Sequence, residues 1–201
     1  TTHLKIYKAT RVDGNWENIV ELSINDEVYS TGHPALSPDN KKLYFVSDRE
    51  GGEGGLDIYA SNITGVESFA NPVNLSAINS GGDDITPFFH DNSQVLYFST
   101  DGDMSLGGFD VYRSVKSNTG FEKPENVGAP TNGSYNDVFY SLNEDGNVGL
   151  LSSNRPGSQY IDANNKSCCY DIFRADIAPL DIKVNALTFD AKSLDSLEGV
   201  T

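Results

Sequence analysis

The feature that most constrains the fold is a short segment that returns twice at a spacing of 53 residues. Leu43–Asp48 (LYFVSD) returns as Leu96–Asp101 (LYFSTD), and Leu150–Arg155 (LLSSNR) is the third copy. The register is marked by a small hydroxyl residue at the same place in each copy, namely Ser47, Thr100 and Ser153. Three copies at one spacing indicate a single supersecondary unit that is repeated along the chain.

Each copy continues with a loop and then a second short apolar run. These runs are Asp57–Tyr59, Asp110–Tyr112 and Asp171–Phe173, the last one delayed by eight additional loop residues. A tight-turn sequence, Ser37–Asn40, precedes the first copy, and its proline presets φ for such a turn. Repeats of about 40 to 50 residues with four strands each are typical of propeller blades. The sequence therefore predicts an all-β fold, a β-propeller of four-stranded blades.

The repeat gives three blades and part of another, because residues 4–22 match only the second half of a blade. Inner strands are expected at Gly32–Leu36, Ile85–Phe89 and Asp137–Leu142. The second and third strands are expected at Leu43–Ser47, Leu56–Ala60, Val95–Thr100, Phe109–Ser114, Val148–Ser152 and Tyr170–Ala175. Outer strands, which carry prolines, are expected at Phe69–Leu75 and Phe121–Val127. Since propellers use about four to eight blades, we expect missing upstream sequence to complete the ring.

Recurring aromatic side chains are expected to pack between neighbouring blades, where cross-strand pairs add about 0.2 to 1 kcal/mol each. A platform for a sugar or another ligand is the alternative interpretation. The residues concerned are Tyr7, Tyr44, Tyr59, Tyr97, Tyr112 and Phe173.

Composition excludes several classes of partner. The formal net charge of −15 argues against binding to nucleic acid or to anionic lipid, which need clustered Lys and Arg. No apolar run approaches the ~20 residues of a membrane span, so membrane insertion by this segment is not expected. The two cysteines, Cys168 and Cys169, are adjacent. They form either a strained vicinal disulfide or two reduced thiols, and two ligands are too few for a structural zinc site.

The repeat ends after Asp176, and Pro179 follows. Beyond it, Leu180–Ala186 alternates like a new strand. We therefore expect two units, the propeller blades in residues 1–178 and the start of a second β domain in residues 179–201.

Binding candidates lie at the beginning of the inner strands, which line the central channel of a propeller. Asp84 and Asp137 are one repeat apart with Thr31 at the equivalent place, and His33 aligns with Thr86. An acidic or polar channel mouth would suit a cation or a basic peptide segment. The alternative is that these residues cap strands and bond neighbouring backbone groups.

Carboxylates also surround the glycine loops, and hard oxygen ligands on a flexible loop suit calcium. The weak candidates are Asp48, Asp57, Asp101, Asp103 and Asp110. They lack the spacing and the final glutamate of an EF-hand, and Asp beside Gly is ordinary turn sequence. No metal or other cofactor is therefore assigned, with calcium as the one open possibility.

No catalytic constellation is visible. The chain has no Gly-x-Ser-x-Gly elbow, and its histidines, His3, His33 and His90, are isolated and do not recur in step. No pair of carboxylates is placed as a general acid and base. The sequence thus predicts a protein without catalytic activity.

Taken together, several motifs resemble one known group. Ser37–Arg49 is similar to the repeat of TolB-like β-propellers. His33–Ser37, the glycine-rich segment Gly51–Tyr59, Pro72–Leu75 and Cys168–Phe173 narrow the resemblance to the propellers of multidomain OmpA-family envelope proteins of Bacteroidetes-type bacteria. That group includes the PorE-type component of the type IX secretion system. Residues 182–201 are similar to the first strands of a carboxypeptidase-regulatory-like β-sandwich.

The resemblance implies a periplasmic, outer-membrane-associated scaffold that binds other cell-envelope proteins. In such proteins peptidoglycan is bound by a downstream domain, which this chain lacks, so no residue here is assigned to peptidoglycan. The alternatives are a propeller that binds a glycan or another small ligand, and the accessory propeller of a hydrolase or lyase.

Overall fold

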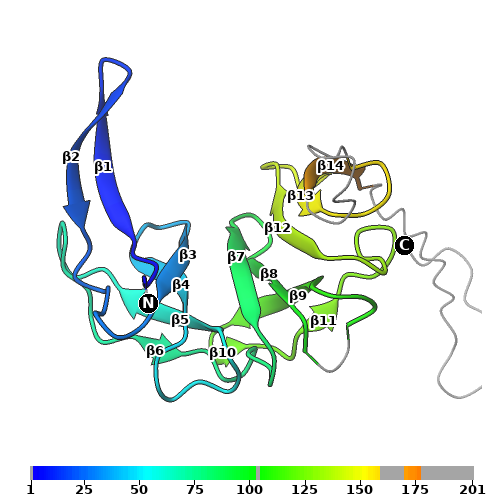
Figure 1. Ribbon diagram of the computed structural model, residues 1–201, viewed down its shortest axis with the longest axis horizontal. Coiled ribbons are helices and arrows are strands. Elements are labelled where there is room, and N and C mark those ends of the chain that lie inside the picture. Colours follow the sequence, from blue (N-terminus) through cyan, green and yellow to red (C-terminus); the bar gives the residue numbers. More distant parts are fainter. Residues whose placement is uncertain (1, 103–104, 159–169, 178–201) are drawn as a thin grey trace, which may run out of the picture.

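The computed structural model describes residues 2–102, 105–158 and 170–177, which form four antiparallel β-sheets (Figure 1). A hairpin of β1 (Tyr7–Val12) and β2 (Asn15–Glu21) comes first. The all-β class predicted from the repeat is confirmed, and the described residues do not close into a ring. No helix in these ranges is long and apolar enough to cross a membrane.

Three larger sheets follow in chain order, and each begins with the strand that the repeat predicted as innermost. The first sheet is ordered β3 (Thr31–Leu36), β4 (Lys42–Ser47), β5 (Asp57–Asn62) and β6 (Val73–Asn74). The second contains β7 (Asp84–His90), β8 (Val95–Thr100), β9 (Asp110–Ser117), β10 (Gly120–Phe121) and β11 (Glu125–Asn126). The third contains β12 (Asp137–Leu142), β13 (Val148–Ser153) and β14 (Asp171–Asp176).

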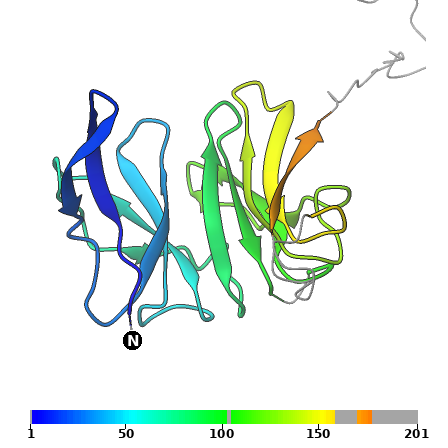
Figure 2. The same cartoon turned by 45° about the horizontal axis from the view of Figure 1, so that its top comes forward.

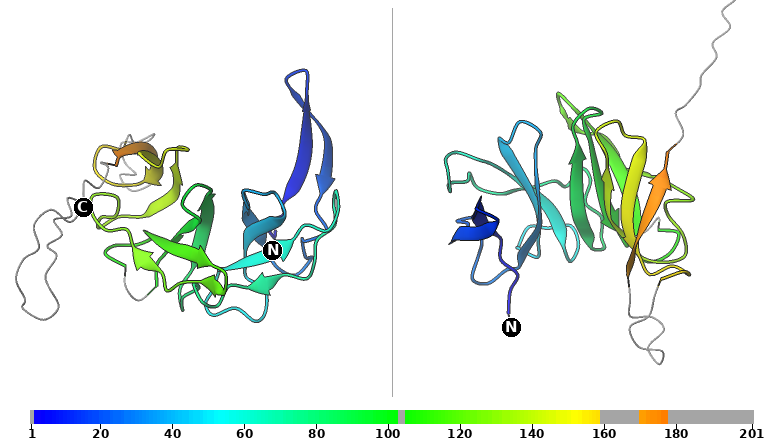
Figure 3. Two further views of the ribbon diagram at one scale, coloured as in Figure 1. Left: turned by 180° about the vertical axis from the view of Figure 1, so that it is seen from behind. Right: turned by 90° about the horizontal axis from the view of Figure 1, so that it is seen from above.

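The sheets stand side by side in chain order along an arc (Figures 1 and 2). The strands β3, β7 and β12 face the concave side, and β3 and β12 both contact β7. The short strands β6, β10 and β11 lie toward the convex side. Seen from behind, the β1–β2 hairpin stands at one end of the arc and the β12–β14 sheet at the other (Figure 3).

Turn chemistry explains why the strands begin where they do. Before β4, the N–H of Asn40 donates to the carbonyl of Ser37 at 2.8 Å, and Asn40 takes a left-handed φ of 54°. The Ser37 hydroxyl accepts the N–H of Lys42 at 2.9 Å and donates to Asp39 at 2.7 Å. Asn and Ser are the residue types that close such turns at little cost.

The outer strands are shorter than predicted. Within Phe69–Leu75 only Val73 and Asn74 pair with β5, and the predicted strand Phe121–Val127 is split into β10 and β11. Pro72 and Pro124 cause the difference, since a proline has no N–H to donate to the ladder.

The apolar core lies between neighbouring sheets. Tyr44 of the first sheet and Phe89 of the second stack at 5.7 Å between ring centroids. Tyr97 and Tyr140 meet at 5.2 Å between the second and third sheets. The predicted packing is wrong for Tyr7, which is 54% exposed because it lies on the open hairpin.

Glycines let the loops of one sheet approach the turns of the next. A Cβ at Gly107 would meet three backbone atoms of residues 133–135 at 2.5 to 2.7 Å. Gly54 is similarly close to the carbonyls of Gly82 and Ser80. These loop glycines are thus required for close packing between sheets.

Candidate functional site

The inner strands share an unusual backbone feature at one position. His33, Thr86 and Phe139 lie 53 residues apart and have left-handed φ values of 45°, 53° and 53°. At each one the ladder to the second strand shifts register, between residues 32 and 35, 85 and 88, and 138 and 141. Left-handed geometry in a non-glycine residue costs free energy and often marks a functional position.

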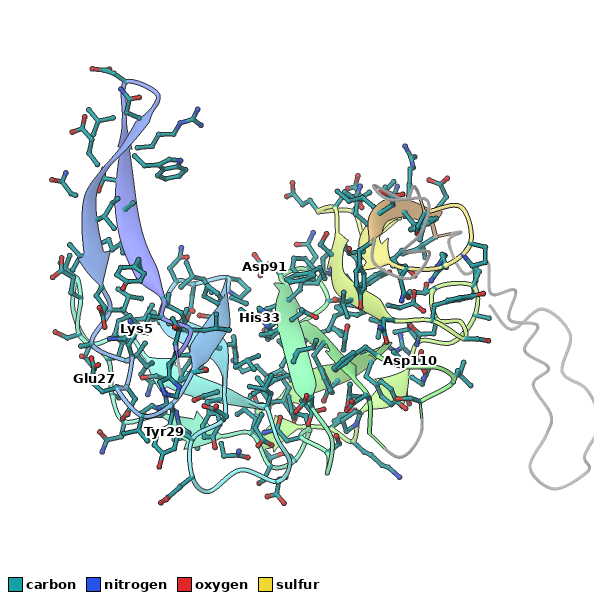
Figure 4. The ribbon with its side chains drawn as sticks, viewed as in Figure 1. Lys5, Glu27, Tyr29, His33, Asp91 and Asp110 are labelled. Atoms are coloured by element: carbon teal, nitrogen blue, oxygen red, sulfur yellow. The ribbon has the colours of Figure 1, made fainter. Side chains whose placement is uncertain are left out.

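These three bulged residues touch one another across the sheets. The Thr86 N–H donates to Nδ1 of His33 at 3.4 Å, and the Phe139 N–H donates to the Thr86 hydroxyl at 3.3 Å. The rings of His33 and Phe139 meet edge to face at 5.4 Å between centroids. Figure 4 shows His33 near the middle of the concave side. We call His33, Thr86 and Phe139 the axial cluster.

A shallow pocket of about 360 Å³ opens at the axial cluster. Its wall combines the cluster with Pro34, Pro87 and Tyr140. Burial lowers the pKa of His33, so the imidazole is neutral at pH 7 and Nδ1 can accept the Thr86 N–H. Phe139 is 58% exposed and offers an apolar surface to a partner. The pocket suits an apolar or aromatic group beside a hydrogen-bonding imidazole.

The other residues predicted at the channel mouth lie deeper. Thr31, Asp84 and Asp137 are each 0% exposed, and Thr86 is 4% exposed. The structure brings His33 and Thr86 together, whereas Thr31, Asp84 and Asp137 each lie in a separate contact between sheets. The side chains of Thr31, Asp84 and Asp137 do not reach the surface of the described residues. Ligand binding by these three residues stays a prediction.

Arginine accompanies two of these three buried positions. Nε of Arg155 donates to the Ser153 hydroxyl at 3.0 Å, and its Nη2 forms an ion pair with Asp137. Arg49, two repeats earlier, donates from Nε to the Ser47 hydroxyl at 3.0 Å. Each guanidinium thus fixes the beginning of an inner strand to the end of the second strand.

Asp84 has no such partner, because Gly102 takes the place of the arginine. Its Oδ2 accepts the Ser80 N–H at 2.6 Å, and its Oδ1 has no hydrogen-bond partner in the described part of the chain. Burial raises the pKa of Asp84 to about 6, and the charge of Asp57 adds to the effect.

The loop carboxylates serve mainly as acceptors for backbone N–H groups. Asp57 accepts from Glu53 at 3.0 Å and from Gly54 at 3.3 Å. Asp48, Asp101 and Asp110 accept from Ser30, Asp83 and Leu106 respectively. Residues 2–102, 105–158 and 170–177 contain no group of three or more His, Cys, Asp or Glu that could hold a metal. Calcium binding at these loops stays a prediction.

Sequence reasoning missed a recurring asparagine and the third member of the axial cluster. The side-chain amides of Asn25, Asn79 and Asn132 each bond both the N–H and the carbonyl of one residue, at 2.8 to 3.0 Å. The bonded residues are Ile6 directly before β1, Ile58 in β5 and Val111 in β9. The asparagine spacing of 54 and 53 residues was visible in the sequence. Phe139 was not predicted as a site residue, because its side-chain chemistry differs from that of His33 and Thr86.

Three predictions fall on residues that the structure does not describe. They are the calcium candidate Asp103, the cysteine pair Cys168 and Cys169, and the second β domain in residues 179–201.

Solved structures with a similar arrangement include two TolB proteins. TolB from Acinetobacter baumannii matches with a TM-score of 0.54 and 18% identity over 86% of this chain and 35% of that one. A putative TolB from Agrobacterium tumefaciens matches with a TM-score of 0.47 and 17% identity over 73% of this chain and 49% of that one. A puromycin-hydrolyzing peptidase from Mycobacterium tuberculosis matches with a TM-score of 0.47 and 15% identity over 92% of this chain and 24% of that one. The chain thus spans about a third of the Acinetobacter protein and shares its fold.

No protein-family model matches the sequence, and no curated protein matches it. One prediction is corrected by the comparison with solved structures. The sequence predicted a protein without catalytic activity, but the similar structures include a peptidase.

Proposed function

We propose that the three sheets are blades of a β-propeller that binds other proteins of the bacterial cell envelope. The similarity to the TolB fold supports this proposal. So does the repeated inner strand, because β3, β7 and β12 face the concave side and each has a bulged residue of left-handed φ at the same position. In this proposal residues 1–178 form propeller blades and residues 179–201 begin a β-sandwich.

The protein acts in the periplasm, associated with the outer membrane. We further propose that it is the propeller of an OmpA-family protein of the PorE type, which serves the type IX secretion machinery. This assignment rests on the sequence motifs quoted above, in particular Ser37–Arg49 and Gly51–Tyr59. Peptidoglycan would then be bound by another domain.

The observation that carries the interaction role is the axial cluster with its pocket. A rigid β scaffold presents an exposed Phe139 beside a neutral His33, at a place where three sheets meet. Aromatic side chains in such settings commonly anchor protein interfaces. The net charge of −15 favours a partner segment that carries basic residues.

Site-specific photo-crosslinking in cells tests the proposal. A photoreactive amino acid at position 139 should capture one defined envelope protein, because this position borders the pocket. The same group at Val66, which is 80% exposed on a loop beside the first sheet, is the matched control. Equal capture from both positions, or none from position 139, would reject the axial face as the binding site.

The pocket also favours a second candidate, a small ligand or glycan held at the axial cluster. In that case ligand density should appear beside Phe139 in crystals of the purified protein, and a F139A variant should lose the ligand. Density elsewhere would exclude this candidate.

A further inference from the structure

The contacts between successive sheets are built alike. The first residue of each inner strand donates its backbone N–H to a carbonyl of the preceding unit, at 2.8 Å from Thr31 to Leu4, 2.6 Å from Asp84 to Leu56 and 2.6 Å from Asp137 to Phe109. We call these contacts the first, second and third junction. The residue that follows the accepting carbonyl is Lys5 at the first junction, Asp57 at the second and Asp110 at the third.

Charges at the first junction are balanced within the chain. Lys5 forms ion pairs with Glu21 at 2.9 Å and with Glu27 at 2.7 Å, and Figure 4 shows Lys5 and Glu27 close together. Nη2 of Arg49 donates to the Thr31 hydroxyl at 3.3 Å. The first junction therefore holds two basic side chains and no buried acid.

The second junction differs from the third. The third holds the carboxylates of Asp110 and Asp137 together with the guanidinium of Arg155, which pairs with Asp137. The second holds Asp57 and Asp84, which are 1% and 0% exposed. Neither of them forms an ion pair with any residue that the structure describes. Two buried carboxylates without a cation are costly, since buried charges need a partner.

The repeat indicates where the balancing charge belongs. Nη2 of Arg155 donates to the carbonyl of Thr131, and Nη2 of Arg49 donates to the carbonyl of Ile24 at 3.2 Å. In both cases the accepting residue directly precedes one of the recurring asparagines. At the second junction the equivalent carbonyl belongs to Ile78, and Gly102 replaces the arginine.

A compensating exchange accompanies the loss of the arginine. A Cβ at Gly102 would lie 2.5 Å from the Ser80 hydroxyl oxygen, so a side chain there requires a smaller residue at position 80. One repeat later that place is Gly133, which leaves room for Arg155. The Ser80 hydroxyl instead bonds the hydroxyl of Thr100 at 3.0 Å. The second junction thus gains oxygen atoms where the third has nitrogen donors.

We propose that the second junction binds a calcium ion through Oδ1 of Asp84 and the carbonyl of Ile78, in the place that a guanidinium takes in the other two junctions. Calcium binds carboxylate, hydroxyl and carbonyl oxygens. Its two charges balance those of Asp57 and Asp84. Oδ1 of Asp84 is fully buried and has no hydrogen-bond partner in the described part of the chain. Oδ1 of Asp110 at the third junction also lacks a partner, but the guanidinium of Arg155 supplies a positive charge there. The ion would join the first sheet to the second, which is a structural role independent of the proposed partner binding.

Thermal unfolding of the chelator-treated chain tests this proposal. Addition of CaCl₂ to one hundred times the dissociation constant should raise Tm by about 5 °C, while equal MgCl₂ should have little effect. Calorimetry should show one binding site. The D84N variant should lose the Tm rise, and D145N, which changes an exposed carboxylate, should keep it.

The double variant S80G/G102R supplies a second test that does not depend on removing an acid. It copies the Gly133 and Arg155 pair into the second junction, so it should have a higher Tm than the wild type without calcium and show no further rise with calcium. Circular dichroism establishes that each variant is folded. Absence of a calcium response in the wild type, or a full response in both folded variants, would overturn the proposal. Neither result bears on crosslinking at position 139.

Discussion

At the residue scale, His33 links the first two inner strands through one hydrogen bond that requires an unprotonated Nδ1. Burial lowers its pKa, so the folded protein resists protonation more than the unfolded chain does. The unfolded chain then takes up the proton first as the pH falls through about 6.5, and folding stability is lost below that value.

We therefore expect His33 to lower the free energy of unfolding by about 1 kcal/mol between pH 7.5 and 5.5. Asp84, whose pKa is raised to about 6, acts in the opposite sense, because the folded protein binds its proton first. The H33N variant should lose the His33 contribution and keep that of Asp84, because asparagine tolerates a left-handed φ and its amide does not titrate in this range. Urea unfolding at several pH values measures the difference. The H3N variant serves as control and should keep the wild-type slope; an H33N profile parallel to the wild type would contradict the prediction.

Asn132 is the most deeply buried of the recurring asparagines. It is 2% exposed and bonds the N–H and carbonyl of Val111 at 2.8 Å, and Oδ1 of Asn126 at 2.7 Å. The N132A variant leaves these buried groups without partners, so it should lose about 2 to 4 kcal/mol of stability. Chemical denaturation measures the loss. N118A, at an exposed loop position, should change stability by less than about 0.5 kcal/mol, and similar losses in both variants would contradict this account.

At the scale of elements, the loops before the third strands determine how closely neighbouring sheets pack. A methyl group on Gly107 would meet backbone atoms, which cannot rotate away as a side chain can. We expect G107A to lower Tm by about 5 °C or more, because the second and third sheets must then separate locally.

Gly81 provides the matched control for that variant. A Cβ there meets no atom within 4 Å, and Gly81 is not among the residues with positive φ. G81A should leave Tm unchanged or raise it slightly, since alanine restricts the unfolded chain more than glycine does. Equal effects of G107A and G81A in differential scanning calorimetry would show that the loops do not pack as described.

The elements themselves were largely predictable from the sequence. Apolar alternation and turn residues gave Asp137–Leu142 its bounds and placed the other inner, second and third strands within a few residues. The bounds of the outer strands were not predictable from the sequence. Pro72 and Pro124 interrupt the hydrogen-bond ladder there, and tertiary packing decides which residues still pair. The predicted packing of Tyr7 was wrong for a related reason, because its position in the repeat does not show whether another sheet covers it.

The candidate site was predictable only in part. Spacing identified His33, Thr86, Asp84 and Asp137, but it did not distinguish residues on the concave surface from those buried in a junction. That distinction depends on the bulge, which turns position 33 toward its neighbours while position 31 stays inside the sheet contact. Phe139 has a different side-chain chemistry, and only its shared φ reveals the equivalence.

At the scale of the whole molecule, stability is unevenly distributed along the arc. Every position of β2 but one is exposed, whereas all but one residue of β8 are buried. Local opening costs least where few apolar contacts form, so amides of the β1–β2 hairpin should exchange fastest among the long strands.

Hydrogen exchange followed by mass spectrometry checks this gradient. Peptides covering residues 7–21 should exchange at least ten times faster than those covering 95–117, which lie between two packed sheets. Equal protection in the two regions would mean that the hairpin is covered in solution by something that completes its sheet.

The axial hydrogen bonds also have a direction. The Thr86 N–H donates to a side chain of the unit before it, and the Thr86 hydroxyl accepts an N–H from the unit after it. The second unit is therefore joined to both neighbours at the same strand position. Excision of 53 residues between two matching positions would restore a continuous backbone with native-like connections on both sides. Genes for such chains can accordingly lengthen or shorten by whole units through recombination, and curvature, reach and the number of presented faces would change in discrete steps.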